Sequence, residues 1–138
     1  MSEDNRALVR RFYEEVIGRG KLELIDELVA PDFIEHEEFP DLPPGREGMK
    51  QVFSMFLEGF PDLHFHVKDL IAEGDKVVAR INMHGTHKGS FMGMEPTGKE
   101  IFVQAIDILR FADGKAVEHW GVTDQMSMME QLGIHSAQ

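Results

Sequence analysis

The sequence contains no cysteine, which excludes disulfides, a thiol nucleophile and any cysteine-ligated metal. Long apolar runs are also lacking, since each is much shorter than the roughly 20 residues that a membrane-spanning helix requires. The first residues, MSEDNRALVRR, have no apolar segment of the kind found in secretory signals. We therefore expect a cytoplasmic protein with no membrane partner.

Positive charge is scarce. The chain has 14 Lys and Arg against 25 Asp and Glu, a formal net charge of −11, and its basic residues do not cluster. Proteins bind nucleic acids largely by neutralising phosphates with Lys and Arg, so we expect no nucleic-acid partner. The remaining composition, 42% hydrophobic and 28% charged residues in a chain of 138, is typical of one globular domain spanning residues 1–138.

The order of the expected elements predicts an α+β fold. Apolar residues at helical spacing come first, and segments with the alternation of strands follow. The predicted elements are helices over residues 8–17, 22–31 and 46–61, a loop over 32–45, hairpins over 63–89 and 101–122, and a short helix over 124–133. Helices followed by antiparallel strands indicate helices packed on one face of a curved sheet, and such a sheet can enclose a pocket.

The register of the second hairpin decides which polar side chains face that pocket. If its loop has three residues, Ala112 to Gly114, then Asp107 lies directly opposite His119. If the loop has two residues, Asp107 faces Trp120 instead, because a slip of one residue turns the whole strand over. The three-residue register leaves the inner face aliphatic except for one carboxylate and one imidazole. We therefore expect Asp107 and His119 to lie within hydrogen-bonding distance.

An Asp–His pair in an apolar pocket can exchange protons near neutral pH. Burial raises the pKa of the acid, and the neighbouring imidazole opposes that shift. We predict that Asp107 removes a proton next to a carbonyl group, and that His119 orients it or protonates the developing oxyanion. The alternative is a buried ion pair without chemistry. Asp124, where the last strand meets the last helix, is either a helix N-cap or a further catalytic acid at the pocket rim.

Several other side chains complete the predicted pocket and its surroundings. We expect the pocket to include Tyr13, His36, Phe53, Phe56, Met83, Ala105 and Gly121. Trp120 faces away from it and, with Ile106 and Ile108, forms an apolar patch that we interpret as a homodimer interface. His64 and His66 share one strand face at a spacing that can ligate a metal, but we interpret this face as exposed to solvent and metal-free.

Several stretches, in the same order along nearly the whole chain, resemble those of one family. They are LVAPDFIEH, PPGREGMK, GTHKGSFMGMEPTGKEI, IDILRFADGKAVEHWGVTD and MMEQLG. They are similar to the SnoaL-like polyketide cyclases and their ester-cyclase-like relatives. The resemblance implies the cone-shaped, cystatin-like fold of nuclear transport factor 2 and ketosteroid isomerase, usually dimeric. It also implies closure of a polyketide ring by intramolecular aldol condensation, without metal or cofactor.

The chain departs from the family pattern at two positions. The resemblance implies a catalytic acid where this chain has Gly121, and a histidine where it has Asp107. We therefore expect either that the carboxylate has moved to the facing strand, beside His119, or that cyclase activity is absent. The hypothesis is a cofactor-independent enzyme that cyclises or isomerises an apolar, oxygenated small molecule. Epoxide hydrolysis, ketosteroid isomerase-like chemistry and a non-catalytic ligand-binding dimer are the alternatives.

Overall fold

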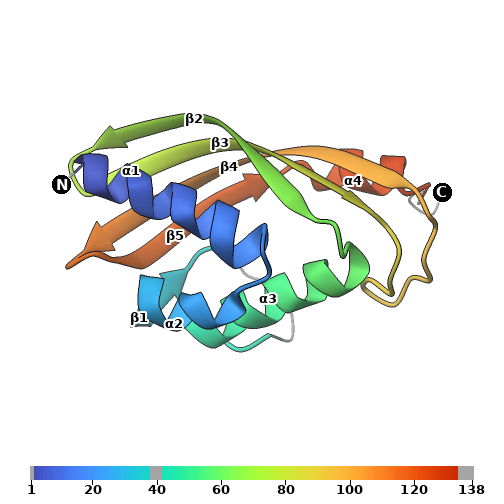
Figure 1. The fold of residues 1–138 in the computed structure, drawn as a ribbon, viewed down its shortest axis with the longest axis horizontal. Helices are drawn as coiled ribbons and strands as arrows, with labels where there is room; N and C mark the ends of the chain where they lie inside the picture. Colours follow the sequence, from blue (N-terminus) through green and yellow to red (C-terminus); the bar gives the residue numbers. More distant parts are fainter. Residues whose placement is uncertain (1, 38–41, 134–138) are drawn as a thin grey trace.

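A computed structural model of the chain describes residues 2–37 and 42–133 (Figure 1). Its elements are α1 (Ser2–Arg11), the π-helix η1 (Phe12–Ile17), the 3-10 helix η2 (Leu22–Leu24), α2 (Ile25–Leu28), β1 (Val29–Glu35), α3 (Gly45–Gly59), β2 (His64–Glu73), β3 (Lys76–Thr86), β4 (Glu100–Ala112), β5 (Lys115–Thr123) and α4 (Gln125–Gln131). Within these residues the strands form one sheet in the order β1-β5-β4-β3-β2. None of the helices described has the length and apolar character needed to cross a membrane.

The predicted α+β architecture is confirmed, because helices cover one face of a curved sheet. Figure 1 shows α1 and α3 on the same side of the sheet. The helix α1 and its continuation η1 pack against β2 and β3, while α3 packs against β1. Alternate residues of the central strands are buried in the core between the layers. They are Val77, Ala79, Ile81, Met83, Ile101, Val103, Ala105, Leu109 and Phe111.

The predictions of the second helix and of the loop after it were partly wrong. Helical structure ends at Leu28, and residues predicted as helix end and loop form strand β1, which pairs in parallel with β5. Pro31 has no amide hydrogen to continue a helix, and it is tolerated in β1 because this strand lies at the sheet edge. Residues 38–41 of the predicted loop lie outside the described residues.

The turn between β4 and β5 differs from the predicted three-residue loop. Ala112 pairs with Lys115, which leaves a two-residue turn. Asp113 and Gly114 both have positive φ, 52° and 77°, and this is the backbone of a type I′ hairpin turn. Asp and Gly are the residues that adopt this conformation most readily, so ADG encodes a tight turn.

A bulge beyond this turn sets the final register. Pairing shifts between Arg110 and Phe111, and Val117 is the extra residue on β5. As a result Asp107 lies opposite Gly121, and His119 lies opposite Leu109. The prediction that Asp107 lies directly opposite His119 was therefore wrong by two positions. An even shift keeps both side chains on the same face, so they remain diagonal neighbours.

Candidate active site

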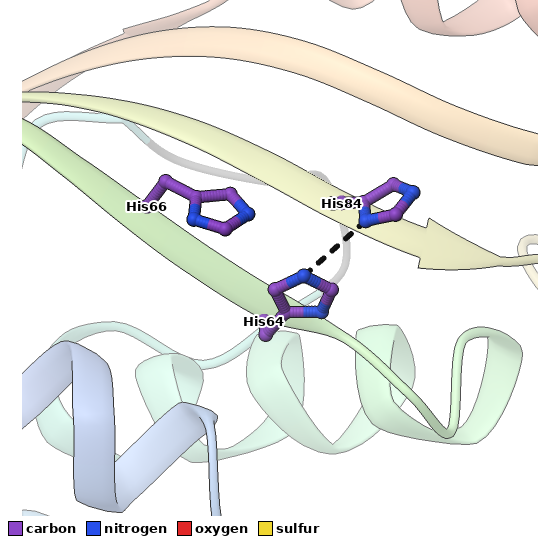
Figure 2. Close-up of side chains that lie close together, drawn as sticks. All are labelled: His64, His66 and His84. Carbon is purple, nitrogen blue, oxygen red and sulfur yellow. Dashed lines mark hydrogen bonds between the residues drawn. The ribbon is translucent and has the colours of Figure 1, made fainter.

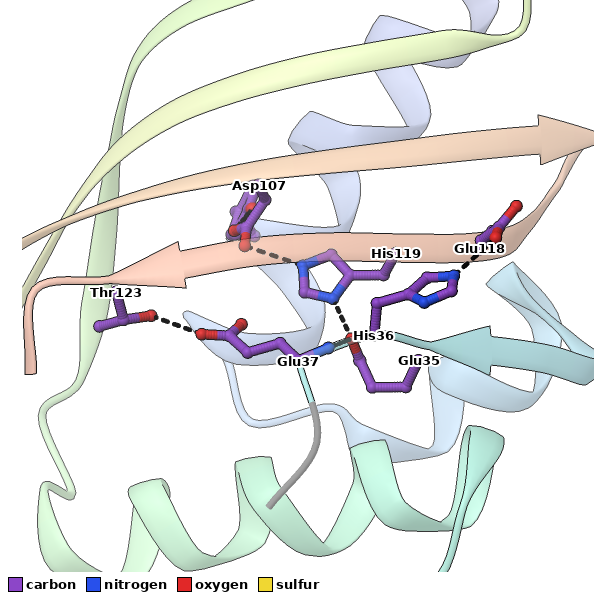
Figure 3. A network of polar contacts seen from close by, with 8 residues as sticks. Glu35, His36, Glu37, Asp107, Glu118, His119 and Thr123 are labelled. Carbon is purple, nitrogen blue, oxygen red and sulfur yellow. Dashed lines mark hydrogen bonds and ion pairs between the residues drawn. The ribbon is translucent and has the colours of Figure 1, made fainter.

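The sheet and the helices enclose a cavity of about 150 Å³. Most of its wall is apolar. Among the residues named from sequence, those at this wall are Tyr13, Phe53, Phe56, Met83, Ala105, Asp107 and His119. Polar side chains gather at one end of the cavity, where β1, β4 and β5 lie side by side (Figure 3). This combination suits an apolar ligand that carries a few oxygen atoms.

His119, on β5, lies at the centre of the polar end. Its Nε2 is 2.8 Å from Oδ1 of Asp107, and its Nδ1 bonds the carboxylate of Glu35. An ionised carboxylate can only accept hydrogen bonds, so both ring nitrogens carry a hydrogen and the ring is an imidazolium. The side chains of His119, Asp107 and Glu35 are 13%, 14% and 19% exposed. The charged group therefore lies largely out of water between two anions.

The pKa of His119 reflects this environment. Burial by itself lowers the pKa of an imidazole, because it penalises the charged form. Here the hydrogen bonds from Asp107 and Glu35, together with their negative charge, outweigh burial and raise the pKa of His119 to about 10. His119 therefore stays charged at neutral pH, between the two carboxylates that bond its ring.

Strand β1 positions two acids that the sequence analysis did not assign to the pocket. Glu35 is the register partner of His119 on β5, and the amide of His36 continues the pairing by donating to the carbonyl of His119 at 3.0 Å. Strand alternation turns Phe33 and Glu35 inward and Ile34 outward. The same alternation brings Glu37 to the cavity, and its amide donates to Glu35 at 3.0 Å. In FIEHE, residues 33–37, every second residue is Phe33, Glu35 or Glu37, and this alternation is typical of a strand. It was the sequence signal that could have revealed both acids.

Glu37 occupies the space beside Gly121. A Cβ at Gly121 would lie 2.6 Å from Oε1 of Glu37, 2.6 Å from Oδ1 of Asp107 and 2.8 Å from Cε1 of His119. No side chain fits at position 121 while these groups stay in place. Gly121 was predicted to line the pocket, but it lies behind these polar side chains instead. The carboxyl of Glu37, two residues after the end of β1, therefore lies where a side chain at position 121 would start.

The pKa of Glu37 is raised above its ordinary value. Burial contributes most, and the negative charge of Asp107 adds to it. The charge of His119 and the hydroxyl of Thr123, which donates to Oε2 of Glu37 at 3.2 Å, oppose the shift. A carboxyl group with a raised pKa accepts a proton more readily than an ordinary glutamate, and this is what a general base near neutral pH requires.

Tyr13 completes the polar end from the helical layer. Here α1 widens into the π-helix η1, as shown by the amide of Gly18, which donates to the carbonyl of Tyr13 at 3.0 Å. The Tyr13 hydroxyl donates to Oδ2 of Asp107. Burial and the nearby Asp107 carboxylate raise the pKa of Tyr13 well above its ordinary value, so it remains a hydrogen-bond donor. Both carboxylate oxygens of Asp107 therefore already accept a hydrogen bond, one from Tyr13 and one from His119.

Glu37, Asp107 and His119 lie close enough to suggest a metal site, since one ligand atom from each falls within 4.8 Å of the others. However, a histidine binds metal through the lone pair of a neutral imidazole. Both nitrogens of His119 carry hydrogens that point at carboxylates. With both of its nitrogens bonded in this way, His119 offers no lone pair to a metal, and the arrangement suits proton exchange better.

His36 does not reach the pocket, contrary to prediction. Its ring stacks on Trp120, with centroids 4.9 Å apart and planes 5° from parallel, and its Nε2 lies 2.6 Å from Glu118 (Figure 3). Strand alternation places His36 on the face opposite Glu35 and Glu37. The side chain therefore belongs to the outer surface of the sheet.

Asp124 is a helix cap and not a pocket acid. Its carboxylate accepts a hydrogen bond from the amide of Ser127 at 3.1 Å, in the first turn of α4. The prediction of a catalytic role is therefore corrected in favour of the capping alternative. At the far end of α4, the Gln131 side chain bonds both backbone groups of Phe102, so the helix protects the edge of β4 beyond the end of β5.

Replacing Asp124 with alanine should test this assignment. We expect the free energy of unfolding to fall by about 1 kcal/mol, because an amide of α4 loses its acceptor. Asparagine at the same position keeps an acceptor and should retain most of the stability. Urea unfolding measures both, and the assignment is wrong if alanine leaves stability unchanged while turnover is abolished.

Comparisons of the sequence with known proteins all find polyketide cyclases. The sequence model of SnoaL-like polyketide cyclases matches residues 7–132. Aklanonic acid methyl ester cyclase DauD of Streptomyces sp. (strain C5) is 29% identical over 133 residues, covering 91% of this chain and 80% of that protein. Nogalonic acid methyl ester cyclase of Streptomyces nogalater is 25% identical over 116 residues, covering 83% and 87%.

Solved structures show the same relationship. TsrD from Streptomyces laurentii superposes with a TM-score of 0.86 at 28% sequence identity, covering 96% of this chain and 97% of that one. IdmH from Streptomyces antibioticus superposes with a TM-score of 0.80 at 35% identity, covering 94% and 98%. The shared fold extends over nearly the whole of both chains.

Proposed function

Because the chain belongs to the family of SnoaL-like polyketide cyclases, we propose that it closes a ring in a polyketide-derived substrate by intramolecular aldol condensation. The observation that carries the proposal is the carboxyl of Glu37, which lies against the charged His119 in an apolar cavity. This carboxyl takes the space where the family resemblance implies an acid at position 121.

Glu37 is the proposed group that exchanges the proton. As a carboxylate it removes a proton from a carbon next to a carbonyl of the substrate. The enolate carbon then bonds to a second carbonyl carbon of the same molecule, and the alkoxide formed takes the proton back from Glu37. The reaction transfers one proton from carbon to oxygen and changes no atom count. A base with a raised pKa suits both halves of this exchange.

Asp107 and His119 act, in this proposal, mainly as positioning residues. Proton removal was predicted for Asp107, but both of its carboxylate oxygens are occupied by hydrogen bonds from Tyr13 and His119. The imidazolium of His119 offsets the negative charge that gathers around Glu37. The enzyme we propose needs no cofactor, because the acid, the base and the compensating charge are all side chains.

The substrate class follows from the cavity wall and from the relatives. Aromatic and aliphatic side chains favour a flat or folded apolar molecule, and the polar end suits its carbonyl oxygens. Two relatives are named for aklanonic acid methyl ester and nogalonic acid methyl ester, which makes these compounds the first probes. Ring closure should give a product of unchanged mass and a new chromatographic retention time. Saturable binding of both probes without conversion would contradict the enzyme proposal and favour a passive binder.

The outer face of the sheet is the proposed homodimer interface. Phe102, Ile106 and Val122 are 53%, 48% and 74% exposed on this face. Ile108 and Trp120, which were predicted to form the patch with Ile106, are a half-buried cross-strand pair beside them. These apolar side chains lie together on the neighbouring strands β4 and β5, with Arg80 opposite Ile106 on β3, and a second copy of the chain related by a two-fold axis would cover them.

Replacing Val122 with aspartate should disrupt such a dimer. Two carboxylates would be brought together and desolvated in the interface, which is unfavourable. Light scattering coupled to size-exclusion chromatography should give a dimer for the wild type and a monomer for this variant. Glu73→Gln, which changes an exposed acid at the end of β2, is the control and should remain dimeric. A monomeric wild type would refute the proposed interface.

A further inference from the structure

Three histidines lie together on the outer face of the sheet, away from the cavity (Figure 2). His64 and His66 come from β2, and His84 is the cross-strand partner of His64 on β3. The residues next to them, Phe65 and Met83, line the cavity, so strand alternation directs the histidines outward. One ring nitrogen from each histidine lies within 4.8 Å of the other two.

Hydrogen bonds determine which nitrogen carries the hydrogen in two of these rings. Nδ1 of His64 lies 3.0 Å from the carbonyl oxygen of Asp62, which can only accept, so Nδ1 carries the hydrogen. Nε2 of His84 lies 3.0 Å from the carboxylate of Glu100 and donates to it in the same way. In the neutral rings, the lone pairs are therefore on Nε2 of His64 and Nδ1 of His84.

These two lone-pair nitrogens face each other at 3.2 Å. Two acceptors at this distance repel, so a positive species must lie between them, either a proton or a metal ion. Zinc binds histidine nitrogen at about 2.0–2.1 Å in tetrahedral geometry, which places neighbouring ligand atoms about 3.3 Å apart. The separation of His64 and His84 therefore already matches that of two ligands on one zinc ion.

The outer contacts of the cluster also have the form found around metal ions. A metal-bound histidine usually donates its other ring hydrogen to a carboxylate or a backbone carbonyl, which fixes the ring and makes the bound nitrogen more basic. Glu100 provides the carboxylate for His84, and Asp62 provides the carbonyl for His64. His66 stands beside them as the third ligand, its ring centroid 5.0 Å from that of His64.

We propose that His64, His66 and His84 bind one divalent transition-metal ion such as zinc. Water would complete the tetrahedral coordination. The site is separate from the proposed cyclase cavity, because its ligands project from the other face of the sheet. It differs from the metal-free interpretation of His64 and His66 because the third ligand comes from the neighbouring strand. A bound ion would tie the edge strand β2 to β3 and stabilise the fold by mass action.

Calorimetric titration of the metal-free protein with zinc chloride tests this proposal. We expect saturable binding of one zinc per chain. His64→Gln and His84→Gln should each weaken binding by at least about 10- to 100-fold, and Glu100→Gln by about 10-fold, since outer contacts support the ligands. His36→Gln removes another surface histidine and should bind zinc as the wild type does. Circular dichroism verifies that each variant is folded.

Two further measurements distinguish zinc on the outer face from zinc in the cavity and from a proton shared by two histidines. Asp107→Asn should leave zinc affinity unchanged, whereas loss of binding in this variant would place the ion in the cavity and overturn the proposal. Zinc should raise the melting temperature of the wild type but not of His84→Gln. A proton shared between His64 and His84 predicts no saturable zinc binding, and that result would also overturn the proposal.

Discussion

Replacing Glu37 with glutamine is expected to lower kcat/KM for ring closure by about 10²- to 10⁴-fold, the range that general acid–base groups contribute. Glutamine has almost the same shape and can still accept the hydrogen bond from Thr123, but it cannot take up a proton. We expect the free energy of unfolding to be unchanged or slightly increased, because one of the clustered acids is removed. A large loss of turnover in a folded protein would assign the proton exchange to this carboxyl.

A companion variant makes the experiment specific. Glu73→Gln changes an exposed acid at the end of β2 and should retain full turnover. Wild-type turnover in Glu37→Gln would show that another group is the base.

Replacing His119 with glutamine is expected to lower the free energy of unfolding at neutral pH by about 3–5 kcal/mol, because buried carboxylates lose their cation. The effect should depend on pH in a defined direction. The pKa of His119 is raised from 6.5 to about 10 in the folded protein. The stabilisation is therefore complete below pH 6.5, decreases as the pH rises, and is lost above pH 10.

Urea unfolding of both proteins between pH 6 and pH 10 measures this dependence. One pKa unit corresponds to about 1.36 kcal/mol, so the shift of His119 corresponds to at most about 5 kcal/mol. The difference in unfolding free energy between wild type and His119→Gln should shrink steadily across this window. His36→Gln, which removes an exposed histidine paired with Glu118, controls for general histidine effects and should show little change. A constant difference across the window would mean that His119 is not the stabilising cation.

Much of the fold could be predicted because local patterns agreed with the final packing. The helical spacing over residues 46–61 corresponds to α3, and the alternation of Val77, Ala79, Ile81 and Met83 correctly identified the buried face of β3. Strand β1 could not be recognised in the same way. It is short, contains a proline and pairs with β5, which is distant in sequence.

The candidate site was only partly predictable for a related reason. The alternation of side chains between the two faces of a strand correctly placed Asp107 and His119 as neighbours on the inner face. This prediction holds because the tight turn and the bulge at Val117 together shift the register by two residues, an even number. A bulge leaves no clear sequence signal, so the true partner of Asp107 could not be derived. Glu35 and Glu37 belong to β1 and its continuation, and missing that strand meant missing both acids.

The relation between Gly121 and Glu37 explains how the chain can keep cyclase-like chemistry while departing from the family pattern. The absence of a side chain at Gly121 on β5 leaves room for the carboxyl of Glu37, which follows β1. In our proposal, the position of the acid in space is preserved although its position in sequence changes. The same geometry accounts for the glycine, since even an alanine Cβ would contact Glu37 and Asp107 too closely.

A single NMR titration that follows the ring of His119 and the side-chain carboxyl of Glu37 tests the proposed proton-exchange site most directly. We predict that the imidazole stays charged through neutral pH and titrates with a pKa of about 10, and that the pKa of Glu37 lies above its ordinary value of 4.5. Titration of His119 near its ordinary pKa of 6.5, together with a Glu37 pKa at or below 4.5, would contradict the account.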